Sequence, residues 1–298
     1  MARSSKLFSA LTRRGPHRCL RGDLAFAGLP GVVYTPEAGF NLPGVAFGHD
    51  WLTDASHYEG TLEHLASWGI VAAAPNTERG LAPSVLNFAV DLGATLDIIA
   101  GVRLGTGKIS VSPAKLGVVG DGFGGSAAVF AAAGLAGTGS AGTGSAGTDK
   151  RAGRQAPLKA AAALFPAVTR PAAFHPALTL KVSGLVVGAP DDQQSLRTDA
   201  MDLARSWNGS VLRIVSKANS SGLAEKRFVS RAFGMPGSNR RTQKTVRALL
   251  TGFLLFHLTG DKAYREFADP DIVFPKTDPP DLAAPPLTTE DQIVALLK

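Results

Sequence analysis

The chain has one cysteine, Cys19, and no apolar run of the roughly 18 residues that a membrane-spanning helix needs. A single cysteine excludes an intramolecular disulfide and a cysteine-based metal cluster. Residues 1–25 begin with basic side chains but contain no apolar block followed by a small-residue cleavage site, so we expect no secretory signal. These absences favour a cytoplasmic protein.

Acidic residues are scarce in two segments, which makes the charge uneven. Residues 1–21 contain six Lys or Arg and no acid, and residues 213–247 contain nine against one glutamate, in a chain with formal net charge +7. A basic face suits an anionic partner, so we expect both segments to contact anionic lipid or protein, which would place the protein peripherally at a membrane. Apolar and basic positions in residues 6–11 suggest a short amphipathic anchor. No motif indicates nucleic-acid recognition.

Short apolar segments alternate with helical patterns along most of the chain. The predicted strands are 31–34, 44–47, 70–74, 116–119, 158–164, 184–187 and 211–215; the predicted helices are 58–67, 84–102, one from Gly124, and 242–258. Nearly continuous apolar strands separated by helices indicate a parallel sheet covered on both faces. We therefore expect an α/β domain whose ligand site lies at the carboxyl ends of the strands.

Two segments depart from this alternation. Residues 134–157 are rich in Gly, Ser and Thr and repeat the pentad GTGSA, so we expect a flexible insertion within the domain. Residues 269–298 begin rich in proline and aspartate, which predicts an extended tail before a short terminal helix. The expected organisation is a basic arm over 1–22, a domain over 23–268 and a tail over 269–298.

Five motifs occur in an order that carries a family resemblance. They are FGHDW (47–51), LASWGIVAAAPNT (65–77), VVGDGFGGSAAV (118–129), LVVGAPDD (185–192) and FLLFHLTGDKAYREF (253–267). Together they resemble the α/β-hydrolase superfamily, most closely its dienelactone-hydrolase, chlorophyllase and cutinase-like branch, over residues 30–268. The resemblance implies the α/β-hydrolase fold, a mostly parallel central sheet with helices on both faces, and a serine–histidine–acid triad that hydrolyses esters.

The triad expected from this resemblance is incomplete. The nucleophile position in the strand–turn–helix elbow is Gly122, and the acid position is Asp192 or Asp191. The histidine position lies near Asn219, where no histidine occurs, and His257 sits in an apolar helical stretch that predicts a packing role. Nucleophile and base act as a unit, so their joint loss predicts that acyl-enzyme chemistry is absent. Glycine also tolerates the positive φ that such an elbow requires.

The same resemblance places five residues around a retained pocket: His49, Asp50, Trp51, Asp121 and Phe123. We expect this cleft to hold a small apolar or ester-like ligand in a protein that binds, or acts as a scaffold, instead of hydrolysing. We expect His49 to be a structural hydrogen-bonding residue, in the loop that supplies an oxyanion amide in the family.

Two alternatives remain open. One is an active carboxylester hydrolase of the dienelactone type whose nucleophile has moved to Asp121 or Ser126. The other is dinucleotide binding, because residues 120–125 match G-x-G-x-x-G between a strand and a helix, although no acid follows at the expected distance. The leading hypothesis requires no cofactor and no metal.

Overall fold

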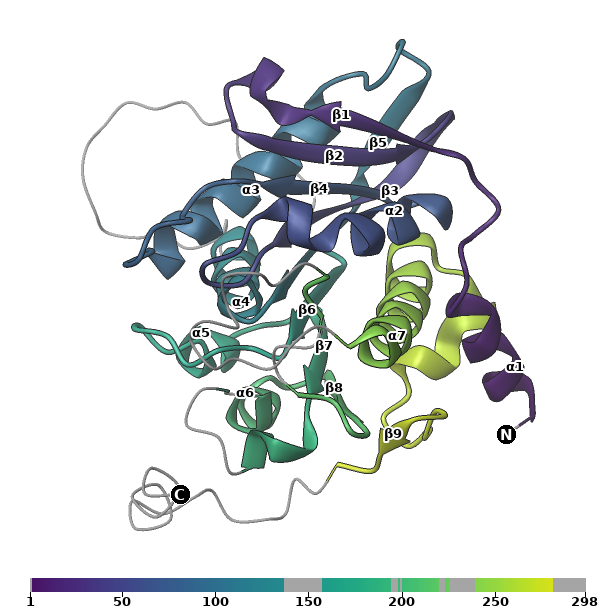
Figure 1. Ribbon diagram of the computed structural model, residues 1–298, viewed down its shortest axis with the longest axis vertical. Coiled ribbons are helices and arrows are strands. Elements are labelled where there is room, and N and C mark those ends of the chain that lie inside the picture. The colour runs from purple at the N-terminus through teal and green to yellow at the C-terminus, as the bar shows by residue number, and fades with distance from the viewer. Residues whose placement is uncertain are drawn as a thin grey trace.

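The computed structural model describes residues 2–136, 157–193, 198, 200–219, 223–225 and 239–280. These residues form an α/β domain around one nine-stranded sheet with the order β1-β2-β4-β3-β5-β6-β7-β8-β9 (Figure 1). The strands are β1 (Cys19–Asp23), β2 (Gly31–Pro36), β3 (Gly39–Gly48), β4 (Val71–Pro75), β5 (Ile109–Asp121), β6 (Ala160–Leu164), β7 (Ser183–Gly188), β8 (Ser210–Val215) and β9 (Thr277–Asp278).

The sheet is mostly parallel, as the alternating sequence pattern predicts. Strands β4, β3, β5, β6, β7 and β8 pair in parallel, whereas β2 is antiparallel to both of its neighbours and β9 is antiparallel to β8. The alanine-rich β6 is fully buried between β5 and β7, which explains how such weak strand formers adopt an extended conformation. The exposed β1 and the short β9 were not predicted.

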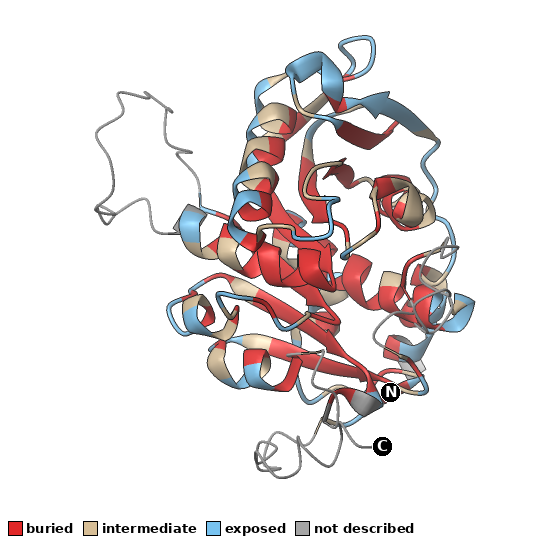
Figure 2. Ribbon diagram, turned by 60° about the vertical axis from the view of Figure 1, so that its left-hand side comes forward, coloured by how far each residue is buried: buried red, intermediate tan, exposed pale blue. Residues whose placement is uncertain are grey.

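Helices cover both faces of the sheet (Figure 2). One face carries α1 (Ala2–Leu11), α2 (Glu59–Ser67) and α7 (Arg240–Thr259); the other carries α3 (Val85–Gly101), α4 (Phe123–Ala136), α5 (Phe174–Ala177) and α6 (Ala200–Ser206). Short 3-10 helices are η1 (Leu24–Ala27), η2 (Ala55–Tyr58), η3 (Pro190–Gln193) and η5 (Lys262–Ala268). Side chains of adjacent strand residues point to opposite faces of the sheet: Phe47 packs beneath α2 and α7, and Ala46 packs beneath α3.

The first 22 residues are built into the domain, so the expectation of a separate basic arm is wrong. Helix α1 packs on α7, and β1 pairs with β2. Phe8 and Leu11 are 2% and 0% exposed, so the apolar side of the expected amphipathic anchor already faces the protein core. Leu7 is partly buried against the same core, so the apolar face of this helix is used mainly for packing within the domain.

The segment after η5 is also held on the domain. The Arg213 guanidinium donates to the backbone carbonyls of Asp269, Pro270 and Ile272, and its Cζ lies 5.3 Å from the centroid of the Phe274 ring. Arg213 is 3% exposed, and burial lowers its pKa to about 10. Residues 269–280 are therefore part of the fold and end with β9.

Two predictions fall outside the described residues: most of the Gly/Ser/Thr insertion, over 137–156, and the terminal helix with the rest of the tail, over 281–298. Within the described ranges, no helix combines the length and the apolar character needed to cross a membrane.

Candidate functional site

The turn between β5 and α4 is a sharp strand–turn–helix corner with glycine at its tip. Gly122 has φ +54°, a left-handed conformation that glycine adopts at little cost. Its N–H donates to Leu164 O at 2.9 Å, and its carbonyl accepts from Ala167 N at 3.0 Å. A Cβ on Gly124 would lie 2.3 Å from the carbonyl carbon of Gly48, so glycine is required for α4 to approach β3 this closely. The turn is thus fixed by backbone contacts.

The space beside Gly122 is filled by the carboxylate of Asp50, which follows β3. A Cβ built on Gly122 would lie 2.0 Å from Asp50 Oδ1 and 2.3 Å from its Cγ. Oδ1 accepts hydrogen bonds from Phe123 N at 2.9 Å and from Trp51 N at 2.8 Å. Two backbone amides therefore converge on one carboxylate oxygen, at the point where a side chain of residue 122 would begin.

This pair of amides has the geometry of an oxyanion hole. In nucleophile elbows, the hole combines the N–H of the residue after the nucleophile with an N–H from the loop after the third strand. Phe123 and Trp51 stand in these two positions. Preorganised amides stabilise negative charge strongly. In this protein the negative group that the two amides bind is the carboxylate of Asp50.

Asp121 lies below the elbow and does not line a pocket. Its side chain is 0% exposed, and its Oδ2 accepts from the hydroxyl of buried Tyr58 at 2.8 Å. The Tyr58 hydroxyl in turn accepts from Asp50 N at 3.1 Å. The expectation that Asp121 faces the pocket is therefore wrong, because the aspartate is used to hold Tyr58 and the loop after β3.

Ser126 is likewise turned inward. It is 0% exposed, and its hydroxyl donates to Ala167 O at 2.5 Å. Its position one turn along α4 places it where the helix packs on the sheet. A hydroxyl that is buried and already donating has no access to an ester.

His49 joins two loops at the carboxyl edge of the sheet. Its Nδ1 lies 2.9 Å from Asp50 O, its Nε2 lies 2.9 Å from Thr77 O, and its ring packs 4.7 Å from the ring of Phe88. Burial lowers the pKa of His49, and the two hydrogen bonds to carbonyls act in the opposite direction. Both nitrogens face backbone carbonyls, so His49 holds the loop after β3 and does not serve a nucleophile.

The acid and histidine positions do not form a catalytic pair. Asp192 follows β7 and is 6% exposed, and its Oδ2 accepts from Ala189 N at 2.7 Å. Asn219 lies half-buried after β8. His257 lies on α7 with its ring 4.4 Å from that of Phe253, and burial lowers its pKa to about 4. The Asp191 side chain is outside the described side chains.

The remaining histidines are engaged elsewhere. All six histidines of the chain lie in the described ranges. His64 is buried in α2, His57 pairs with Asp54 at 3.0 Å, His175 lies in α5, and His17 lies in a hollow beside β1. None of these positions is at the elbow.

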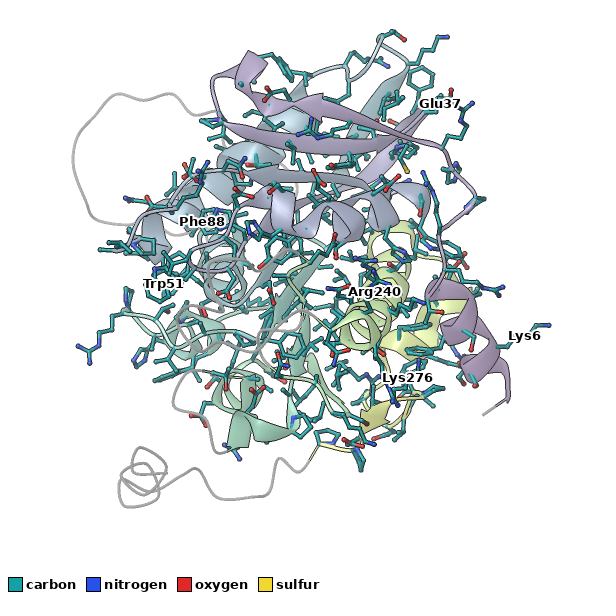
Figure 3. The ribbon with its side chains drawn as sticks, in the orientation of Figure 1. Lys6, Glu37, Trp51, Phe88, Arg240 and Lys276 are labelled. Carbon is teal, nitrogen blue, oxygen red and sulfur yellow. The ribbon has the colours of Figure 1, made fainter. Side chains whose placement is uncertain are left out.

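Three loops at the carboxyl edge of the sheet each carry an exposed apolar residue. Trp51 is 42% exposed and donates from Nε1 to Leu81 O at 3.3 Å; Leu81 and Val168 are more exposed still. These residues follow β3, β4 and β6, whose carboxyl ends meet at one edge of the sheet. Figure 3 shows Trp51 and Phe88 on the same side of the molecule. Phe123 is only 8% exposed, and its ring stacks on that of Phe88 with the centroids 6.0 Å apart.

One residue near the expected histidine position was missed by the sequence reading. Glu225 accepts from Gly60 N at 2.9 Å and from Thr61 N at 3.0 Å, and so caps the N-terminus of α2. It also pairs with Arg247 of α7 at 2.7 Å. Burial lowers the pKa of Arg247, and the charge of Glu225 opposes this. No local pattern could reveal a cap supplied from more than 150 positions along the chain.

Comparisons with protein-family models and with curated proteins find no match to this chain. The function must therefore be argued from the site. Among the described residues, no group of three or more His, Cys, Asp or Glu could hold a metal ion.

Proposed function

We propose that this protein is a catalytically degenerate member of the α/β-hydrolase fold that binds a small apolar ligand or acts as a scaffold. The single observation that carries the proposal is the carboxylate of Asp50 at the nucleophile position, bound by both amides of the hole. The elbow after β5 and the placement of the two amides favour the α/β-hydrolase fold over other parallel-sheet folds.

The chemistry of ester hydrolysis is disfavoured at this site for two reasons. An attacking hydroxyl needs a neighbouring base, and within the described part of the chain the elbow offers neither group. A carbonyl oxygen that gains negative charge needs free amide donors, and Asp50 holds both. The negative charge of Asp50 would also repel such an oxyanion. A neutral apolar ligand meets no such penalty beside Trp51 and Leu81.

The two alternatives are less compatible with this geometry. A nucleophile relocated to Asp121 or Ser126 would have to act from a fully buried position. A dinucleotide would need free amides at the glycine turn, but the Phe123 amide is bound by Asp50. A pyrophosphate placed there would also meet the Asp50 carboxylate directly.

The test is covalent labelling together with turnover. We expect no labelling by a fluorophosphonate probe and no hydrolysis of p-nitrophenyl esters of several chain lengths above that of a buffer control. An active serine esterase assayed in parallel shows that probe and substrates work. Labelling or turnover that Ser126→Ala or Asp121→Asn abolishes would establish the relocated nucleophile and overturn the proposal. Enhanced NAD(P)H fluorescence on titration would favour the dinucleotide site.

A further inference from the structure

The end of the molecule that carries β1 presents apolar side chains among cations. Phe40, at the start of β3, is 61% exposed and Leu20, in β1, is 42% exposed. Both strands begin at the end of the long axis where the turn before β5 also lies (Figure 1). Leu20 and Lys108 line one hollow, and the N–H of Gly39, the neighbour of Phe40, donates to Lys108 O at 3.0 Å, so the two apolar residues lie on either side of Lys108. Exposed apolar residues of this size that share one end of a molecule are typical of a contact surface.

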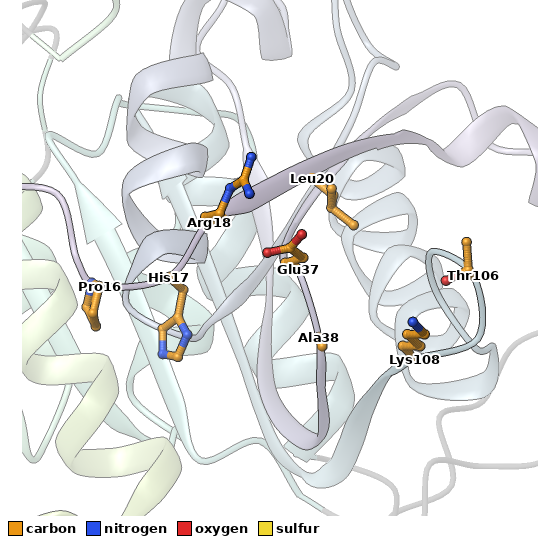
Figure 4. Close-up of a pocket in the computed structure, with 8 residues that line it drawn as sticks. All are labelled: Pro16, His17, Arg18, Leu20, Glu37, Ala38, Thr106 and Lys108. Atoms are coloured by element: carbon orange, nitrogen blue, oxygen red, sulfur yellow. The ribbon is translucent and has the colours of Figure 1, made fainter.

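Cations surround these two apolar residues. The Cζ of Arg103 lies 5.2 Å from the centroid of the Phe40 ring. Figure 4 shows an open hollow in which Leu20 and Glu37 lie between Arg18 on one side and Lys108 on the other. We define the β1-end surface as Arg18, Leu20, Phe40, Arg103 and Lys108.

The composition of the β1-end surface indicates an interface with lipid. Its cations match the negative charge of an anionic leaflet, and Glu37 is the single acid lining the hollow. Phe40 and Leu20 can enter the headgroup region while the flanking guanidinium and ammonium groups contact phosphates. Helix α1 cannot do this, because Phe8 and Leu11 are buried against the domain.

We propose that the β1-end surface docks this protein on an anionic lipid bilayer. The inference rests on the interaction role proposed above but not on the loss of ester chemistry. The membrane contact and the elbow are separate sites, since Phe40 and Lys108 lie at the starts of β3 and β5, whereas Asp50 and Gly122 follow the ends of these strands.

The test is co-sedimentation of the full chain with phosphatidylcholine vesicles, with and without phosphatidylserine. We expect binding that needs phosphatidylserine and weakens with salt. Each cation near an anionic surface contributes roughly fivefold to partitioning. The double variant Arg18→Glu, Lys108→Glu should therefore lose most of the binding, by roughly two orders of magnitude or more. Phe40→Ser should weaken binding severalfold with the charge unchanged.

Matched controls lie by α5 and the start of β7. Leu178 is 65% exposed, so Leu178→Ser removes a comparable apolar side chain, and Lys181→Glu reverses a comparable charge. Both should bind vesicles as the parent does. Equal binding to neutral vesicles, equal losses in the controls, or no binding would overturn the inference. The inference would also be overturned if binding depended on phosphatidylserine but was unchanged in the Phe40→Ser variant. That result would indicate a surface for an acidic macromolecule. None of these results alters the labelling test at the elbow.

Discussion

Replacing Gly122 with alanine should destabilise the protein more than the same change at an ordinary left-handed glycine. The added Cβ would lie 2.0 Å from Asp50 Oδ1, so the carboxylate must leave its two amides. Gly209 is the matched control, because it has φ +81° and no atom within 4 Å of a built Cβ.

The magnitudes of the two changes can be separated. A left-handed non-glycine residue costs about 1 kcal/mol, which is all that Gly209→Ala should cost. Eviction of Asp50 adds the loss of two charge-assisted hydrogen bonds, each worth ~2 kcal/mol, and hydration of the half-buried carboxylate offsets part of this loss. Gly122→Ala should therefore lower the free energy of unfolding by about 3 kcal/mol.

The assay is urea unfolding arranged as a double-mutant cycle. In an Asp50→Gly background the clash is gone, so Gly122→Ala should cost only about 1 kcal/mol, and the coupling between the two sites should be about 2 kcal/mol. The reasoning would be refuted if the changes in unfolding free energy at residues 50 and 122 were additive, or if Gly122→Ala and Gly209→Ala cost the same. Either result would mean that the Asp50 carboxylate does not fill the space beside Gly122.

Three further outcomes test the supporting structure. Glu225→Ala removes the α2 cap and the carboxylate that pairs with the partly buried Arg247, so chemical denaturation should show that the free energy of unfolding falls by about 3 kcal/mol, and a change near zero would contradict the capping role. Arg213→Met should cost about 2 kcal/mol and increase proteolysis of residues 269–280, whereas unchanged proteolysis would mean that other contacts hold that segment. Burial lowers the pKa of His64 and of His257 from 6.5 to about 4, and the charge of Arg247 contributes at His64. As the pH falls, these histidines therefore become protonated in the unfolded chain at a higher pH than in the folded protein. The free energy of unfolding should therefore fall as the pH drops from 6.5 to 4, by about 2 kcal/mol at pH 5 for His64 and by less for the partly exposed His257. In urea titrations at pH 6.5 and at pH 5, the His64→Asn variant should show a smaller difference between the two free energies than the parent.

Much of the fold could be predicted because its strands are locally distinct. Segments such as 116–119 and 211–215 are short, apolar and bounded by turn residues, and they form β5 and β8 as expected. The strand β1 could not be found in this way, because Cys19–Asp23 is exposed and carries no apolar alternation. Its place in the sheet depends on pairing with β2.

The site could be predicted only in part, for the same kind of reason. The glycine at position 122 and the lack of a histidine near Asn219 are properties of the chain, and the incomplete triad inferred from them stays a prediction. The directions of Asp121 and Ser126 were not predictable, since each depends on distant partners, Tyr58 and Ala167.

Residue type and near neighbours were sufficient to predict the seven central strands and their main helices, the conformational freedom at Gly122 and the lack of a reactive side chain at that residue. The position of the Asp50 carboxylate beside Gly122 followed from tertiary contacts alone. Asp50 is separated from Phe123 by 73 positions, and packing of β3 against β5 brings the carboxylate to the Phe123 amide. Packing of α1 on α7 likewise buried the apolar residues that would have formed an amphipathic anchor, because burial is a property of the assembled layers and not of the segment.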